Sequence, residues 1–142
     1  MKTRVEFDSI GSMKVPENAY YGVQSLRAKI NFNITNRKLD KNFIISLAEI
    51  KKACAITNKN TGDLNIKIAE AIIKACDEII DGNFHEEFIV DPIQGGAGTS
   101  SNMNANEVIA NRAIEILGGV KGGKRKSFGV FYCFKNSNKI SL

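Results

Sequence analysis

The chain has 142 residues, 43% of them hydrophobic and 25% charged, a composition typical of one soluble globular domain. No apolar run approaches the ~20 residues of a membrane span, and the N-terminus lacks the apolar core of a signal peptide, so we expect a cytoplasmic protein. The net charge of +5 is uneven, because residues 121–142 contain six Lys and Arg and no acid. Residues 1–120 carry 14 basic and 15 acidic residues, which argues against a nucleic-acid-binding protein.

The first 39 residues mix short alternating segments with turn residues. Polar and apolar residues alternate at 4–8, residues 9–12 are typical of a turn, and residues 13–15 resume the alternation. Pro16 and Asn18 mark a second turn. These features predict an extended N-terminal arm with short strands and one helical turn.

Three later segments have apolar residues at three- and four-residue spacing, which predicts helices at about 40–60, 65–81 and 105–117. Asp40 is a predicted N-cap, and Gly82 suits a left-handed residue after the second helix. The predicted apolar faces are Phe43, Leu47, Ile50 and Cys54, flanked by Ile44, Ala48 and Ala55; Ala69, Ile72, Ile73, Cys76, Ile79 and Ile80; and Val108, Ile109, Ala113, Ile116 and Leu117. The pattern predicts a mainly α domain.

Few side chains point to a metal site or to acid–base chemistry. The three cysteines lack any paired metal spacing, and Cys54 and Cys76 fall on predicted apolar faces, so we expect buried thiols. His85, the only histidine, cannot form a metal cluster alone. Glu86 and Glu87 are adjacent in sequence, so they are interpreted as solvated surface residues and not as an acid–base pair.

The most distinctive stretch is residues 94–104, with three glycines, a threonine, two serines and two asparagines in eleven positions. Glycine lets the backbone approach a ligand, and the hydroxyls and amides are preferred helix caps. A helix N-terminus is a natural seat for an anion, so the stretch predicts a carboxylate or phosphate site. An ordinary capped helix after a polar loop is the alternative. A P-loop has a Lys-Ser/Thr pair after its last glycine, whereas here Gly98 is followed by Thr99 and Ser100. Ser101 stands where a dinucleotide-binding motif has its third glycine. Both differences argue against a nucleotide-binding site.

Four stretches carry a resemblance to a known family. They are VPENAYYG at 15–22, LRA at 26–28, ACDEI at 75–79, and residues 94–112, in which GTSSNMN leads into NEV. In this order they resemble the N-terminal domain of the aspartase/class II fumarase superfamily, from about Ser9 to Gly119. The Tyr-Tyr-Gly at 20–22 and the Gln-Gly-Gly-Ala-Gly at 94–98 are closer to aspartate ammonia-lyases than to class II fumarases.

The resemblance implies a mainly α lyase domain at 1–119, with three main helices and an extended N-terminal arm. It implies a carbon–nitrogen lyase that converts L-aspartate to fumarate and ammonia through an aci-carboxylate intermediate, without an organic cofactor or a metal. The alternatives are a class II fumarase that converts fumarate to malate, a non-enzymatic basic binding module whose aromatic tail contacts nucleic acid, and a fragment that assembles with a separate remainder.

The resemblance also implies where substrate binds. Thr99 matches a family residue that hydrogen-bonds the carboxylate of the intermediate, which needs preorganised donors. Ser100, Ser101 and Asn102 are candidates for supporting contacts or caps. Arg27 matches a family arginine near the active site, with a structural ion pair as the alternative.

Residues 120–142 depart from the family pattern. The family continues into a Ser-Thr-Asn-Asp-type segment, a central helical-bundle domain and a Gly-Ser-Ser loop with the serine base, and none of these motifs is in the sequence. We therefore expect a frameshifted or truncated product with exposed apolar patches, inactive alone and without an assigned catalytic residue. The family forms homotetramers through the bundle, an assembly not expected of this chain. The expected partner is a small-molecule substrate, with no nucleic acid and no membrane.

Overall fold

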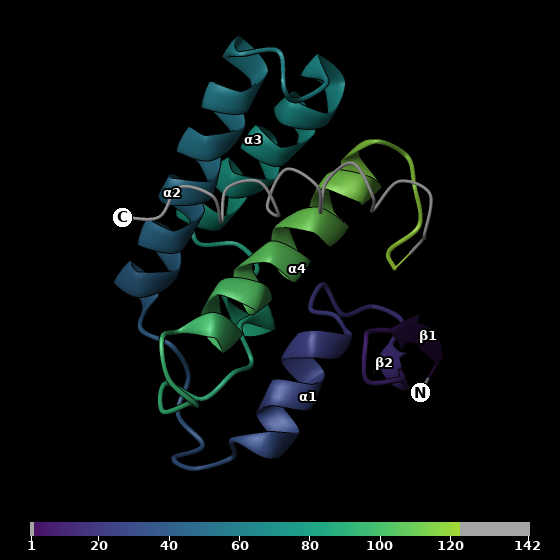
Figure 1. The fold of residues 1–142 in the computed structure, drawn as a ribbon, viewed down its shortest axis with the longest axis vertical. Coiled ribbons are helices and arrows are strands. Elements are labelled where there is room, and N and C mark those ends of the chain that lie inside the picture. The colour runs from purple at the N-terminus through teal and green to yellow at the C-terminus, as the bar shows by residue number, and fades with distance from the viewer. Residues whose placement is uncertain (1, 123–142) are drawn as a thin grey trace.

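The computed structural model describes residues 2–122, so the predictions for Cys133 and for the basic and aromatic segment after residue 122 lie outside the described residues. The elements are β1 (Thr3–Phe7), β2 (Ser12–Pro16), α1 (Val23–Asn31), α2 (Lys41–Asn60), α3 (Ile66–Ile80), a 3₁₀ turn η1 (His85–Glu87) and α4 (Thr99–Ile116). The predicted mainly α fold is confirmed. In Figure 1, α4 runs between the α2–α3 pair on one side and α1 with the β-hairpin on the other. None of the helices in residues 2–122 has the length and apolar character needed to cross a membrane.

The helices α2 and α3 begin where their cap residues predict. The side chain of Asp40 accepts a hydrogen bond from Asn42 N, and the side chain of Asn65 accepts one from Lys67 N. Such caps satisfy backbone N–H groups that have no partner inside the helix. Gly82 follows α3 with φ of +99°, the left-handed conformation expected for a glycine at this position.

The buried face of α2 differs from the predicted one. Phe43 and Ile50 are 46% and 57% exposed, whereas Ile44 and Ala48 face the core. The buried stripe is offset by one residue and includes Lys51, which is 5% exposed. A periodicity analysis counts lysine as polar and therefore shifts the stripe toward its large apolar neighbours.

The apolar faces of α3 and α4 form the core as predicted. Ile72 and Ile79 of α3 and Val108 and Ile109 of α4 are fully buried, together with Phe88 from the segment between these helices. Of the three predicted apolar faces, only that of α2 leaves large side chains exposed. The sequence analysis expects exposed apolar patches, and among the three predicted faces only that of α2 has them.

The arm contains the predicted short strands, which pair as a hairpin, but has more helix than predicted. Strands β1 and β2 pair antiparallel, with Arg4 opposite Val15. The expected single turn is instead the nine-residue helix α1. Its N-cap is Gly22, which has no side chain to mark a helix start. The groups that cap α1 come from elements far away in sequence, so the local pattern underestimates its length.

The helix α4 begins at Thr99, six residues before the predicted start at Ala105. The polar run that suggested a loop is the first part of the helix. Asn104 within it is fully buried: its amide oxygen accepts from Ile89 N at 2.8 Å, and its amide nitrogen donates to Glu87 O at 2.9 Å. Polar residues here satisfy backbone groups of the segment that crosses α4.

Candidate functional site

The predicted anion site lies at the first turn of α4, where two glycines set the backbone. Gly96 and Gly98 have φ of +77° and +72°, a region that L-residues rarely adopt. Gly98 is the N-cap residue, so it contributes no side-chain hydrogen bond to the helix start. The first turn also contains no acidic residue. The positive end of the helix dipole is therefore not neutralised by a carboxylate of its own turn.

Gln94 connects the glycine loop to this turn. Its Oε1 accepts a hydrogen bond from Ser101 N at 2.9 Å, and its Nε2 donates to Ser101 Oγ at 2.8 Å and to Asp91 O at 2.9 Å. Ser101 is 3% exposed. The structure thus gives Ser101 a supporting and capping contact; direct contact with substrate stays a prediction for this residue.

Lys51 brings a buried positive charge from α2 to the same turn. Its Nζ donates to Asn102 Oδ1 at 2.7 Å. Because the lysine is almost completely buried, its charge is screened less than that of a surface lysine. Asn102 therefore links the helix start to a cation, a contact that the sequence pattern did not predict.

Besides the half-buried Asn102, the accessible residues at this turn are Thr99, which is exposed, and Ser100, which is half-buried. Within residues 2–122, no hydrogen bond from their backbone N–H groups is formed with a capping side chain. A hollow of about 530 Å³ adjoins the turn, lined by Leu39, Asp40, Phe43, Pro92, Ile93, Gln94, Gly96, Gly98 and Ser101. The structure therefore brings Thr99, Ser100, Ser101 and Asn102 together on one helical turn, and their role in binding substrate remains a prediction.

Arg27 lies in a different environment. Its Nε and Nη2 donate to Asp8 Oδ2 and Oδ1 at 2.9 and 3.0 Å, a two-point ion pair that holds α1 to the hairpin turn. The hydrogen bond from Arg27 lowers the pKa of Asp8. The described contacts of Arg27 thus correspond to the structural alternative, and a contact with substrate stays a prediction.

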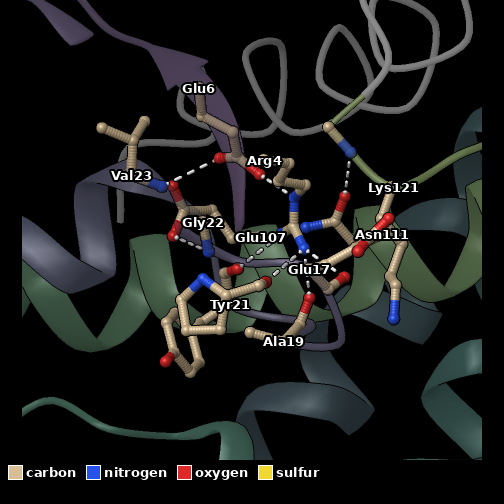
Figure 2. Close-up of polar contacts among 12 residues, drawn as sticks. Arg4, Glu6, Glu17, Ala19, Tyr21, Gly22, Val23, Glu107, Asn111 and Lys121 are labelled. Atoms are coloured by element: carbon tan, nitrogen blue, oxygen red, sulfur yellow. Dashed lines mark hydrogen bonds and ion pairs between the residues drawn. The ribbon is translucent and has the colours of Figure 1, made fainter. Parts of the chain in front are cut away.

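A buried carboxylate that the sequence analysis missed lies at the N-terminus of α1 (Figure 2). Glu107 of α4 is 3% exposed. Its two oxygens accept from Gly22 N, Gln24 N and Ser25 N at 2.9 to 3.0 Å and from Ser25 Oγ at 2.5 Å. Burial raises the pKa of Glu107, and these hydrogen bonds oppose the increase. The start of α1 is therefore occupied by a side chain of the protein itself.

Two further groups complete this cluster. Glu6 Oε2 accepts from Val23 N at 2.9 Å, so the first helical N–H of α1 also has a carboxylate partner. Arg4 donates to Glu6 Oε1 at 2.7 Å. The guanidinium of Arg4 also donates to the carbonyl oxygens of Pro16, Glu17, Ala19 and Tyr21 at 2.9 to 3.0 Å (Figure 2). Arg4 thereby fixes the chain between β2 and α1.

The residues after α4 contact this arm. Lys121 Nζ donates to Asn18 O at 2.8 Å and lies 4.1 Å from the centre of the Tyr20 ring. Gly122 N donates to Asn111 Oδ1 at 3.0 Å. Burial and the neighbouring Glu115 raise the pKa of Tyr20 to about 12. The domain boundary at residue 119 stays a prediction, because these contacts involve only Lys121 and Gly122 of the segment that follows it.

The remaining candidates have structural contacts. Glu86 is exposed, as predicted, and it forms an ion pair with Lys38. The prediction is wrong for Glu87, which is half-buried and accepts from Tyr20 N at 2.7 Å because the arm folds over it. His85 Nε2 lies 2.8 Å from Ile79 O. Cys76 is buried and Cys54 is half-buried, and residues 2–122 contain no cluster of three His, Cys, Asp or Glu side chains arranged to hold a metal.

Comparison with known proteins gives the family of this chain. The family described as Lyase matches residues 11–129. The aspartate ammonia-lyase of Bacillus subtilis is 54% identical over 119 residues, which are 84% of this chain and 25% of the relative. The class II fumarate hydratase of Thermosynechococcus vestitus is 46% identical over 122 residues, 86% of this chain and 26% of the relative.

Solved structures agree with the sequence comparison. The structure described as fumarate lyase:delta crystallin from Brucella melitensis superimposes with a TM-score of 0.86 at 47% identity, covering 91% of this chain and 31% of that structure. The chain therefore spans about a quarter of the length of the curated relatives that it matches. It belongs to the lyase family and corresponds to the N-terminal region of the aspartase/class II fumarase superfamily, as its four motifs predicted.

Proposed function

We propose that this chain is the N-terminal region of an aspartate ammonia-lyase and that the first turn of α4 binds a carboxylate of L-aspartate or fumarate. The observation that carries the proposal is a helix N-terminus with glycine at its cap, no acid in its first turn and two accessible hydroxyl residues. A substrate carboxylate would accept from Thr99 and Ser100, which offer N–H and O–H donors at the positive end of the helix.

The chemistry of the reaction requires such a site. Removing a proton from the carbon beside a carboxylate places two negative charges on that carboxylate, and donors fixed in advance stabilise this charge more than they stabilise the substrate. Lys51 adds positive charge through Asn102. The side chains of Gln94 and Asn102 are neutral amides, Ser101 is buried and Lys51 Nζ donates to Asn102 Oδ1, so none of these residues is assigned as the base. We propose that the chain alone does not convert aspartate.

Two observations support ammonia-lyase over hydratase chemistry. The identity to the aspartate ammonia-lyase of Bacillus subtilis is 54%, against 46% for the class II fumarate hydratase of Thermosynechococcus vestitus. The Tyr-Tyr-Gly at 20–22 and the Gly-Gly-Ala-Gly at 95–98 are the aspartase-like forms of these motifs. The two chemistries share the fumarate carboxylates and differ in whether ammonia or water leaves.

Nuclear magnetic resonance (NMR) titration of the ¹⁵N-labelled chain tests the binding site. Fumarate is expected to shift the amide signals of Thr99 and Ser100 in a saturable way and to leave those of Gly22 and Gln24 unchanged. A parallel titration compares L-aspartate with L-malate, and tighter binding of L-aspartate is expected. Shifts confined to surface lysines, or the absence of saturable shifts at α4, would contradict the proposal. Fumarate formation from L-aspartate by the purified chain would contradict the expected inactivity.

A further inference from the structure

We infer that Gln94 is a positioning residue that caps α4 from outside the helix and thereby leaves the first two backbone N–H groups of the helix to a bound carboxylate. The cap itself is the hydrogen bond from Ser101 N to Gln94 Oε1. The identity of the bound group rests on the proposed function.

The position of the capping oxygen is the first step. In most helices an N-cap Ser, Thr, Asp or Asn accepts a hydrogen bond from the second or third N–H of its own helix. In α4 the N-cap is Gly98, and the N–H of Ser101, the third helical residue, is bonded to Gln94 Oε1 at 2.9 Å. Gln94 therefore supplies the capping bond from four residues before the cap position.

The space in front of the helix is the second step. A Cβ built on Gly98 would meet no atom within 4 Å, so the glycine borders open space. A serine or aspartate at this position would place its side-chain oxygen over the first turn, where a ligand must approach. The capping oxygen of Gln94 instead accepts from the N–H of Ser101, a residue that is 3% exposed. Capping and ligand binding thus use different N–H groups.

The anchoring of Gln94 is the third step. Its Nε2 is fixed by Asp91 O and Ser101 Oγ. Asp91 is 5% exposed, and its carboxylate accepts from Thr35 N at 2.6 Å and from Asn36 N and Ile93 N at 2.9 Å. Both the oxygen and the nitrogen of the Gln94 amide are therefore hydrogen-bonded, to Asp91 before the glycine loop and to Ser101 in the helix after it. This arrangement fixes the glycine loop without a contact to the ligand.

The variants Gln94→Ala and Gln94→Glu separate positioning from folding. Gln94→Ala removes the cap, and we expect faster exchange of the Ser101 amide, larger amplitude motion of residues 95–98 in ¹⁵N relaxation, and about fivefold weaker fumarate binding, the size of one lost cap. Gln94→Glu keeps an acceptor for Ser101 N but loses the donor to Asp91 O, so its melting temperature should fall no further than that of Gln94→Ala. Its negative charge beside the ligand should nevertheless abolish the fumarate-induced shifts. The control Gln24→Ala removes an exposed glutamine side chain on α1.

The outcomes distinguish this inference from the proposed function. Unchanged exchange at Ser101 and unchanged motion of residues 95–98 in Gln94→Ala would overturn the inference, even where the wild type binds fumarate. Full fumarate binding by Gln94→Glu would also overturn it. If the loop of Gln94→Ala loses order while the wild type shows no fumarate binding, the capping role stands and the proposed ligand is wrong.

Discussion

The N-termini of α1 and α4 start alike and are completed in opposite ways. Both helices have a glycine at the N-cap position, Gly22 and Gly98, and neither has an acidic residue in its first turn. At α1, two carboxylates from other elements, Glu107 and Glu6, accept the N–H groups of four consecutive residues. At α4, the neutral amide of Gln94 accepts one N–H group.

The difference separates a structural helix end from one suited to binding. A helix N-terminus attracts negative charge, and at α1 the protein supplies that charge from its own core. At α4 the cap is neutral, the cation Lys51 lies one hydrogen bond away, and Thr99 and Ser100 remain accessible. A bound carboxylate at α4 would accept hydrogen bonds from the N-terminal N–H groups of the helix, as Glu107 does at α1. Variants at each end test this correspondence.

The largest expected effect is on the stability of the α1 end. Glu107→Ala leaves three N–H groups, of which those of Gly22 and Ser25 are buried, and the Ser25 hydroxyl without their acceptor. Unsatisfied buried donors cost about 1–3 kcal/mol each before relaxation, so we expect a loss of roughly 3 kcal/mol or more in the free energy of unfolding by urea. Glu107→Gln, which keeps one acceptor oxygen, should lose less than half as much. A wild-type free energy of unfolding for Glu107→Ala would show that the carboxylate does not hold α1.

The two cap glycines give the next effect. A Cβ on Gly22 would lie 2.7 Å from Glu107 Oε1 and from Glu6 Oε2, so Gly22→Ala must displace both carboxylates and should cost about 2–3 kcal/mol. A Cβ on Gly98 meets no neighbour but requires a positive φ, which should cost about 1 kcal/mol. Thermal melting of both variants measures the difference. A larger decrease in melting temperature for Gly98→Ala than for Gly22→Ala would mean that the N-terminus of α4, and not that of α1, is the more tightly packed one.

The charge near α4 gives a smaller effect, on binding. Lys51→Met removes the cation next to Asn102 and should weaken fumarate binding about tenfold, because a buried charge acts over several ångströms with little screening. The matched control is Lys52→Met, since the neighbouring Lys52 is about one-third exposed and pairs with Asp77 away from this turn. NMR titration measures both affinities. Equal affinities for the two variants would contradict a role of the Lys51 charge at the site.

The sequence predicts what local residues determine. Asp40 and Asn65 cap their own helices, so the starts of α2 and α3 were predicted within one residue. The glycine stretch predicts a helix start because its donors and glycines are contiguous, and its role as an anion site stays a prediction. The start of α1 was missed because its acceptor, Glu107, lies 85 residues from Gly22. The early start of α4 was missed because its capping residue, Gln94, lies across the glycine loop. A helix prediction that looks for a capping side chain at the N-cap position does not detect such a cap.

The smallest expected effect is a pH dependence that only the α1 end should have. Glu107 has a raised pKa because burial outweighs its hydrogen bonds. A carboxyl whose folded-state pKa exceeds its ordinary value of 4.5 binds its proton more readily in the folded state. Its stabilising contribution is therefore present below pH 4.5 and is lost as pH rises through the folded pKa. Glu107→Gln removes this titration, whereas Gln94 at α4 has none.

The free energy of unfolding of the wild type minus that of Glu107→Gln should therefore fall as pH rises above 4.5. Urea titrations at a series of pH values measure it, and the difference cancels the acid-side losses from Asp8 and Glu78, whose pKa values are lowered by Arg27 and Arg112. A difference that instead rises with pH would mean that the four hydrogen bonds outweigh burial. In that case the hydrogen bonds at α1 would stabilise the Glu107 carboxylate more than burial penalises it, as the donors at α4 are proposed to stabilise a substrate carboxylate, and the two helix ends would differ only in whether the anion belongs to the protein.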